Sequence, residues 1–256
     1  MQAIEKQLIV LESIAKLKNN GDGFSIAEMS NETGLDKSTL HRICSVLLKR
    51  GYIYQTHKRG KYFIGHKFLL YSGINRRATG IKEQALPFLN KLSKDVSETV
   101  DLIIFDGMNL FSMVSILPNQ VLQAVPNISD LHPFPFHATA VGKVLLASLP
   151  RDRVETEINN MVLTAYTDNA ITDKDQLKNE IELVRRNKVA YDIEEYTEGI
   201  SSIVAPIKDD DREVVGAVTI VGPSLRLSKL KLKQLTPVIL DCALQVSRSL
   251  GYKGEL

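Results

Sequence analysis

The stretch LDKSTLHRIC, residues 35–44, carries side chains of the kinds that recognise phosphates and the edges of bases. Its polar positions are Lys37, Ser38, Thr39, His41 and Arg42. Arginine can bridge the two acceptors of a guanine, hydroxyl groups serve bases or phosphates, and lysine contacts mainly phosphates. The composition fits either a nucleic-acid contact surface or an ordinary solvated face, and the neighbouring elements must decide between them.

A helix is needed to present these polar side chains together. Apolar residues recur here at the spacing of one helix face, Asp36 is a suitable N-cap, and Gly51 ends the pattern. The apolar positions are Leu40, Ile43, Cys44, Leu47 and Leu48. We therefore predict an amphipathic helix with Cys44 in its core face and the polar residues on the other.

Two more helices are predicted before this one. The first follows an apolar pattern from Ile4 to Ala15, and NNGDG (19–23) breaks it. The second begins at SIAEMSNETG, in which Ser25 and Glu28 have the spacing of a capping box and Gly34 marks the end. A short turn then leads into the helix at 37–50, which is the helix-turn-helix arrangement.

A hairpin is predicted next, from residues 52–55 and 61–64, because both segments are rich in aromatic and β-branched residues. The basic connection at 56–60 would form its tip. Three helices and a cationic wing predict a winged helix-turn-helix that inserts its second motif helix into the major groove of double-stranded DNA. The predicted DNA-binding residues are Ser25, Lys37, Ser38, Thr39, His41, Arg42, Lys58, Arg59 and Lys61.

The charge distribution favours the same interpretation. Residues 1–77 contain 13 Lys and Arg against 6 Asp and Glu, whereas residues 78–256 contain 19 against 24. A basic first third joined to an acidic remainder indicates that a small N-terminal unit meets a polyanion. Chance segregation of charge is the alternative.

Several classes of protein fit the sequence poorly. No apolar run approaches the length that spans a bilayer, and the N-terminus lacks a signal-peptide pattern, so we expect a cytoplasmic protein without a membrane partner. The two cysteines lack metal spacing, and we predict no metal site and no cofactor.

Gly142-Lys143 lacks the rest of a phosphate-binding loop. Ser201 or Ser202 with His137 and Asp192 could compose a triad, but GISSI is no nucleophile elbow, so we predict no catalytic residue and no enzyme.

At this point the sequence resembles the IclR family of bacterial transcriptional regulators, over almost the whole chain. The resemblance rests on SIAEMSNETGLDKSTLHRICSVLLKRGYI, GKYFIGHKFLLYSG, FPFHATAVGKVLLASLP, VRRNKVAYDIEEYTEGISSIVAPI and VVGAVTIVGPS, which occur in the family's order. It implies an N-terminal winged helix, a linker helix and a C-terminal effector domain similar to GAF domains. It also implies dimers that pair into tetramers.

The residues after the wing fit this plan. We expect a DNA-binding domain at 1–75, a linker helix at 76–95, which Gly80 and Pro87 could interrupt, and an effector-binding domain at 96–256. Residues 99–116 predict a hairpin around Asp106-Gly107, a helix is expected from about 138 to 149, and two apolar strands flank KDDDRE. Helices and strands alternate without a βαβ rhythm, so the fold class is α+β with an antiparallel sheet.

The resemblance also implies a small-molecule pocket. Its ligand contacts fall on Ala140, Val141, Asp192, Ser202, Thr219 and Val221, with Asp192 placed before the sheet strand. Ser202 stands where many members have Cys, and Val221 stands where sensors of small acids tend to have Ser. This departure disfavours the smallest keto acids and allows a larger or less polar organic acid. Val141 and Val221 are alternatively plain core residues.

The predicted function is therefore a sequence-specific transcriptional regulator, a repressor of a catabolic operon whose DNA binding responds to a small organic-acid effector. One winged domain reads too little sequence alone, so a palindromic operator and a homodimer, or a dimer of dimers, are expected. The alternative is a DNA-binding regulator or architectural protein without an effector.

Overall fold

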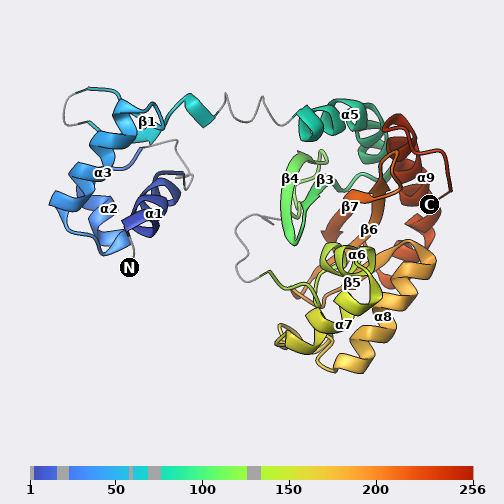
Figure 1. The fold of residues 1–256 in the computed structure, drawn as a ribbon. Helices are drawn as coiled ribbons and strands as arrows, with labels where there is room; N and C mark the ends of the chain where they lie inside the picture. The colour runs from blue at the N-terminus through green and yellow to red at the C-terminus, as the bar shows by residue number, and fades with distance from the viewer. Residues whose placement is uncertain (1–2, 16–22, 58–59, 69–75, 126–133, 256) are drawn as a thin grey trace. The chain divides into compact units, whose positions relative to one another are not determined.

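The computed structural model describes residues 3–15, 23–57, 60–68, 76–125 and 134–255 (Figure 1). The chain divides into two compact units, Met1–Arg76 and Arg77–Leu256. Each unit has its own hydrophobic core. The two are therefore described separately.

The first unit packs three helices against a two-stranded hairpin. The helices are α1 (Ala3–Ala15), α2 (Ile26–Thr33) and α3 (Lys37–Lys49), and the strands are β1 (Ile53–Gln55) and β2 (Tyr62–Ile64). Their core is built from buried apolar residues of every element. Its fully buried members include Val10, Met29, Leu40 and Cys44. The predicted winged helix-turn-helix is thus present.

Capping residues fix where the two motif helices begin. Ser25 caps α2 in a complete capping box with Glu28, and Gly34 ends the helix in the left-handed conformation that glycine adopts most easily. Asp36 caps α3 by accepting a hydrogen bond from the backbone N–H of Thr39. These local signals account for the accuracy of the predicted boundaries.

The second unit is built on one antiparallel sheet with the strand order β4-β3-β7-β6-β5. Its strands are β3 (Thr99–Asp106), β4 (Asn109–Ile116), β5 (Ala190–Ile193), β6 (Ile200–Lys208) and β7 (Val214–Pro223). The central strands β6 and β7 are buried along almost their whole length. This agrees with helices on both faces of the sheet, and the α+β class is confirmed.

Helices α5 (Arg76–Val96) and α9 (Lys229–Ser249) pack on one face of the sheet, where they share a core with β3, β6 and β7. Helix α6 (Ala140–Ser148) packs on the other face, together with part of α8 (Lys174–Asn187). Helix α7 (Arg151–Asn160) lies against α8 (Figure 1). The unit therefore has three layers, and the start of α6 faces the sheet.

Some elements differ from the sequence-based expectation. Helix α5 continues through both Gly80 and Pro87, because Ile81, Ala85 and Leu89 bury one face while Pro87 lies on the exposed face, where water can satisfy the carbonyl freed by proline. Helices α7 and α9 and strand β5 are not predicted from the sequence. No helix among the described residues is long and apolar enough to cross a membrane.

Candidate functional site

Helix α3 presents the polar face that its sequence pattern predicts. Leu40, Ile43, Cys44 and Leu47 are buried. Lys37, Ser38, His41 and Arg42 are exposed on the opposite face, and Thr39 is half-buried. Helix α3 therefore offers two permanent cations and a histidine to solvent from one surface.

The hydroxyl groups at the start of α3 are bound to the N-cap residue. Ser38 Oγ donates to Oδ1 of Asp36 at 2.6 Å, and Thr39 Oγ1 donates to Oδ2 at 2.7 Å. These hydrogen bonds, that from Ser38 foremost, hold the pKa of Asp36 well below its usual range. A base or phosphate must therefore compete with a fixed carboxylate for both hydroxyls.

Ser25 is committed in a similar way at the start of α2. Its hydroxyl donates to Glu28 Oε2 at 2.8 Å and accepts the backbone N–H of Glu28 at 3.3 Å. In the wing, Lys61 is half-buried just before β2, while the predicted contacts Lys58 and Arg59 lie outside the described residues. Of the nine predicted residues, the structure brings Lys37, Ser38, Thr39, His41 and Arg42 together on one helix.

The second unit contains a cavity of about 430 Å³ between the start of α6 and the sheet. This size lies within the range of small-molecule sites. All six residues predicted for the pocket line it: Ala140, Val141, Asp192, Ser202, Thr219 and Val221. Other lining residues include Phe134 and Val204, which make much of the wall apolar.

The floor of the cavity is a set of cross-strand pairs. Asp192 of β5 pairs with Ser202 of β6, and Ser202 in turn pairs with Val221 of β7. Thr219 pairs with Val204 one step along the same face. Directly paired residues of antiparallel strands point to the same side of the sheet, so sheet register alone assembles these side chains. Asp192 precedes the strand of Ser202, as expected, and itself lies on the edge strand β5, which is not predicted from the sequence.

The wall opposite the sheet is the first turn of α6. Thr139 is its N-cap, and its hydroxyl accepts the backbone N–H of Gly142 at 3.3 Å and donates to the carbonyl of Pro135 at 3.1 Å. The backbone N–H groups of Ala140 and Val141 have no acceptor among the described residues. The positive end of the helix dipole therefore meets the cavity, which is a favourable setting for an anion.

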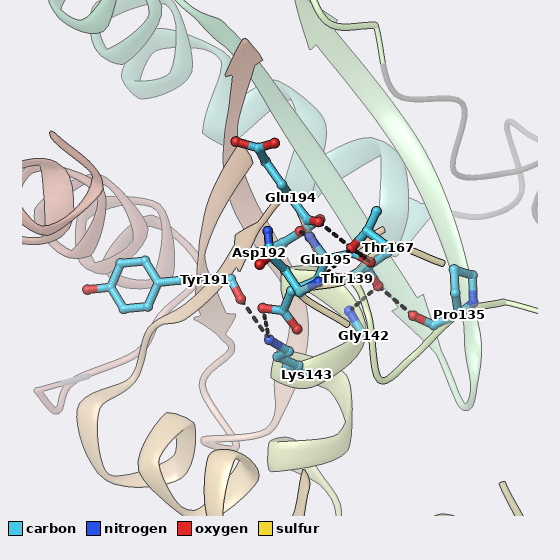
Figure 2. A network of polar contacts seen from close by, with 10 residues as sticks. Pro135, Thr139, Gly142, Lys143, Thr167, Tyr191, Asp192, Glu194 and Glu195 are labelled. Atoms are coloured by element: carbon cyan, nitrogen blue, oxygen red, sulfur yellow. Dashed lines mark hydrogen bonds and ion pairs between the residues drawn. The ribbon is translucent and has the colours of Figure 1, made fainter. Parts of the chain in front are cut away.

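A buried ion pair joins this helix to the segment that follows β5, the strand of Asp192 (Figure 2). Lys143 Nζ lies 2.6 Å from Glu195 Oε1 and donates to the carbonyl of Tyr191 at 2.9 Å. The backbone N–H of Glu195 donates to Asp192 Oδ1 at 2.8 Å. Helix α6, the ion pair and Asp192 thus form one continuous network, which reaches the cavity at Asp192.

Burial dominates the electrostatics of this network. It raises the pKa of Asp192 to about 7, against the hydrogen bond from the N–H of Glu195, and the nearby Glu195 carboxylate adds to the increase. Burial likewise raises the pKa of Glu195, although Lys143 opposes the effect. Asp192 is therefore close to half-protonated at neutral pH and can donate as well as accept a hydrogen bond.

A catalytic triad does not form from the residues that could compose one. His137 Nε2 lies 3.0 Å from the carbonyl oxygen of Thr164. The hydroxyl group of Ser201 forms a hydrogen bond with that of Ser224. Ser202, the next residue on β6, points to the opposite face of the sheet and lines the cavity. His137 and Ser201 thus make separate structural hydrogen bonds, and Ser202 lines the cavity.

One group of described carboxylates is close enough to share a cation, Asp209, Asp210 and Asp211 in the turn between β6 and β7. Asp209 Oδ1 accepts the backbone N–H groups of Asp211 and Glu213 at 3.1 and 3.0 Å. That arrangement is ordinary turn chemistry. We assign no metal to it.

Sequence reasoning missed the buried ion pair and a buried carboxyl group, Asp101 on β3. Lys143 gave a signal, because a lysine inside the apolar run AVGKVLLA of a buried helix requires an anionic partner. Asp101 gave another, since it interrupts the apolar strand TVDLIIF. Neither signal identifies the partner, which comes from a distant part of the chain.

Comparisons with known proteins agree on one family. The family model for the IclR helix-turn-helix domain matches residues 3–57, and the model for the bacterial transcriptional regulator IclR C-terminal domain matches residues 76–248. The HTH-type transcriptional regulator Rv1719 of Mycobacterium tuberculosis is 35% identical over 84% of this chain and 81% of its own. The acetate operon repressor of Salmonella typhimurium is 26% identical over 98% and 90%.

A solved structure is similar over the full length. It is an IclR homolog from Microbacterium hydrocarbonoxydans complexed with 4-hydroxybenzoate, with a TM-score of 0.79, 18% identity, and coverage of 98% of this chain and 99% of that chain. At this identity the likeness establishes the fold alone.

Proposed function

Since the chain belongs to the IclR family of bacterial transcriptional regulators and is a DNA-binding regulator, not an enzyme, we propose that a small organic acid in the cavity of the second unit controls its binding to DNA. Residues 1–75 are the DNA-binding domain in this proposal, 76–95 the linker helix and 96–256 the effector-binding domain. DNA is read by α3, with the wing contacting the flanking backbone.

The observation that carries the proposal is the polarity of the cavity. The start of α6 contributes two backbone N–H groups, of Ala140 and Val141, that have no acceptor among the described residues, and β5 contributes the carboxyl group of Asp192. The described lining contains no Lys or Arg. A carboxylate bound at the helix start needs no buried cation, because the N–H groups and the helix dipole stabilise it.

The remaining lining residues fit the rest of such a ligand. Asp192 accepts or donates at the far end, and Ser202 and Thr219 provide hydroxyl groups from the floor. Val141 and Val221 pack against its carbon atoms. Thr219 Oγ1 is buried and has no partner in the described structure, and a ligand would satisfy it.

The regulated genes are inferred from the relatives. The matched Salmonella protein is a repressor of the acetate operon, and the Microbacterium homolog was crystallised with an aromatic acid. Both names support the proposal that this protein represses a catabolic operon and responds to an acid that the operon handles. The cytoplasm is the compartment in which it would meet both DNA and metabolite.

The test measures effector response and DNA binding in the same preparations. Full-length protein is titrated onto labelled DNA from the region upstream of its own gene, with and without gluconate, pyruvate or 4-hydroxybenzoate. Asp192→Ala and Ala140→Leu should lose the response of the wild-type protein while ligand-free DNA binding stays within about two-fold. Asp175→Ala, whose side chain is 87% exposed, serves as the control.

Two results would contradict the proposal. Loss of folding and DNA binding together in both cavity variants would make these residues structural. DNA binding that no organic acid changes, with no acid raising the melting temperature of the wild-type protein, would favour an architectural protein without an effector.

A further inference from the structure

A second, smaller recess lies at the other end of α6. It has a volume of about 50 Å³ and is lined by the C-terminal half of α6, the end of α8, the end of β6 and the start of β7. Pro206, which lines it, comes two residues after Val204 of the cavity and shares its face of β6. The recess is therefore separate from the cavity, which the first turn of α6 lines.

Three cationic side chains line this recess. Arg185 and Lys188 come from the end of α8, and Lys208 comes from the end of β6. All three residues are half-buried. No Asp or Glu is among the described residues that line the recess, and its other walls are apolar apart from Ser148. Positive charge is thus concentrated against a mostly apolar surface.

One of the three cations has structural partners. Arg185 Nη2 donates to the carbonyl of Leu149 at 3.0 Å, and its Nε lies 3.6 Å from Oε1 of Glu182. A cation is stabilised where a helix ends, so the end of α6 alone accounts for the position of Arg185. The other two cations need a different explanation.

The two lysines lack comparable partners. The ammonium groups of Lys188 and Lys208 have no hydrogen-bond acceptor and no ion-pair partner among the described residues. Lys208 Nζ lies 5.3 Å from the centre of the Tyr252 ring, whose face attracts a cation but leaves its N–H groups without oxygen acceptors. Burial lowers the pKa of Lys188, and the charges of Lys208 and Arg185 lower it further. The three cations therefore repel one another, and a bound anion would relieve that repulsion.

We propose that this recess binds a phosphate group, either free phosphate or the phosphate ester of a small metabolite. The site would give the second unit a ligand of another class than the organic acid of the cavity. It does not rest on the proposed function, because none of its cations lines the cavity.

A phosphate group matches the recess in charge and in its number of acceptors. A phosphate ester carries about 1.5 to 2 negative charges at neutral pH and has three strongly accepting oxygens. Lysine and arginine are the side chains that commonly bind such groups. A carboxylate has one charge and two oxygens, so it would leave one of the three cations without a partner.

The size of the recess also favours this group. One water molecule needs roughly 10–15 Å³ of such space, so a recess of about 50 Å³ admits a group of a few heavy atoms and not a whole metabolite. The remainder of a phosphate ester would therefore extend into solvent. This size explains why the recess would select for the phosphate group itself.

Calorimetric titration of the full-length protein tests the site. The probes are inorganic phosphate, glycerol 3-phosphate and glucose 6-phosphate, with nitrate as the singly charged probe and chloride holding the ionic strength constant. At least one phosphate compound should bind with a Kd of about 1 mM or tighter, and about ten-fold or more tightly than nitrate. Tightest binding of inorganic phosphate identifies free phosphate as the ligand, and tighter binding of an ester identifies a phosphorylated metabolite.

Lys188→Gly separates ligand binding from a structural role. Residue 188 has a φ of 58°, a left-handed conformation that glycine adopts most easily, so the ligand-free variant should melt at the same or a higher temperature than wild type. It should nevertheless bind the phosphate compound at least about ten-fold more weakly, because one charged donor is lost. Lys208→Gln should show a similar loss.

Arg212→Gly is the matched control. Arg212 is an exposed cation with a φ of 67°, and it does not line the recess. Its replacement removes the same charge from the same kind of backbone position. This variant should bind the phosphate compound within about two-fold of wild type.

Three results would overturn the inference. The first is that no phosphate compound binds wild-type protein more tightly than nitrate. The second is an equal loss in Lys188→Gly and Arg212→Gly, which would mean that phosphate responds to overall charge or binds elsewhere, for example on the basic first unit. The third is weaker binding of double-stranded DNA by Lys188→Gly without any binding of the phosphate compounds, which would make the lysines contacts to DNA. None of these results bears on the cavity, which Asp192→Ala tests.

Discussion

Lys143 and Glu195 form an ion pair of 2.6 Å between α6 and the segment after β5, with side-chain exposures of only 1% and 11%. The pair connects α6, whose first turn lines the cavity, to the segment that follows Asp192, which lines it as well. Asp192, which accepts the backbone N–H of Glu195, is held by the same segment. This buried ion pair therefore helps to hold the helix start and Asp192 in place, together with the pairing of β5 and β6.

Replacing Lys143 should show how much free energy is lost when Glu195 is buried without its partner. We expect Lys143→Met to reduce the free energy of unfolding of the second unit by about 3–5 kcal/mol, because Glu195 would remain as an uncompensated buried charge. Adding Glu195→Gln should restore part of the loss. Urea unfolding of both variants measures this, and an equal or larger loss in the double variant would contradict the explanation.

The raised pKa of Asp192 predicts a pH dependence of stability. The folded protein holds the proton up to about pH 7, whereas the unfolded chain releases it near 3.8. Between these values the native state binds more protons, so the contribution of Asp192 to stability falls as pH rises and is constant above 7. Melting temperatures of Asp192→Asn should therefore rise relative to wild type from pH 4.5 to pH 7. A constant difference between the two proteins would contradict the shifted pKa.

The exposed arginine of α3 should read bases. Arg42→Ala is expected to weaken operator binding by about 1–3 kcal/mol and to relax specificity at one position. Lys58→Ala in the wing should instead weaken all sequences about equally and reduce the salt dependence. Fluorescence anisotropy on operator and scrambled DNA at several salt concentrations distinguishes the two effects. Unchanged operator binding by Arg42→Ala would mean that α3 does not read the groove in the proposed way.

Gly142 should tolerate no side chain. A Cβ atom there would lie 2.5 Å from both Cα and the carbonyl oxygen of Phe136, in the loop that precedes α6. We expect Gly142→Ala to destabilise the second unit by about 1–3 kcal/mol and to weaken effector binding, because the start of α6 must move. Gly80→Ala is the control, since its Cβ meets nothing within 4 Å. Thermal unfolding that ranks the two variants equally would contradict the tight packing.

The protein should act on DNA as an oligomer, because one winged domain contacts too few base pairs for specific binding. We expect a dimer, or a dimer of dimers, on a palindromic operator whose half-sites are separated by about one or more helical turns of DNA. Light scattering at micromolar concentration and footprinting of the operator measure these properties. A monomer that binds its operator with full affinity would contradict the expectation.

The sequence predicts the first unit well because its signals are local. The capping box of Ser25 and Glu28, the N-cap at Asp36 and the apolar face of α3 each depend on residues within a turn or two of one another. The same is true of the β3–β4 hairpin around Gly107. Such features need no knowledge of distant partners.

The cavity is predicted less completely because its floor is assembled by register between distant segments. The resemblance to the family identified six lining residues, but it did not predict that Asp192 lies on a strand of its own. The four-residue strand β5 exists through its pairing with β6 and has no pattern of its own. Asp101 was missed for a related reason, since it is buried beside Thr219 of β7, a strand far away in the sequence.

The pairing of Thr99 with Val221 has a consequence for how the molecule is made. The β3–β4 hairpin leaves the ribosome long before β7, so the second edge of β3 has no partner strand until most of the chain has been synthesised. Contacts of such large sequence separation slow folding, while the helical N-terminal unit can fold as soon as it emerges. The N-terminal unit should thus be folded before the cavity of the second unit has formed. Chaperone binding would be concentrated in the interval between the two events.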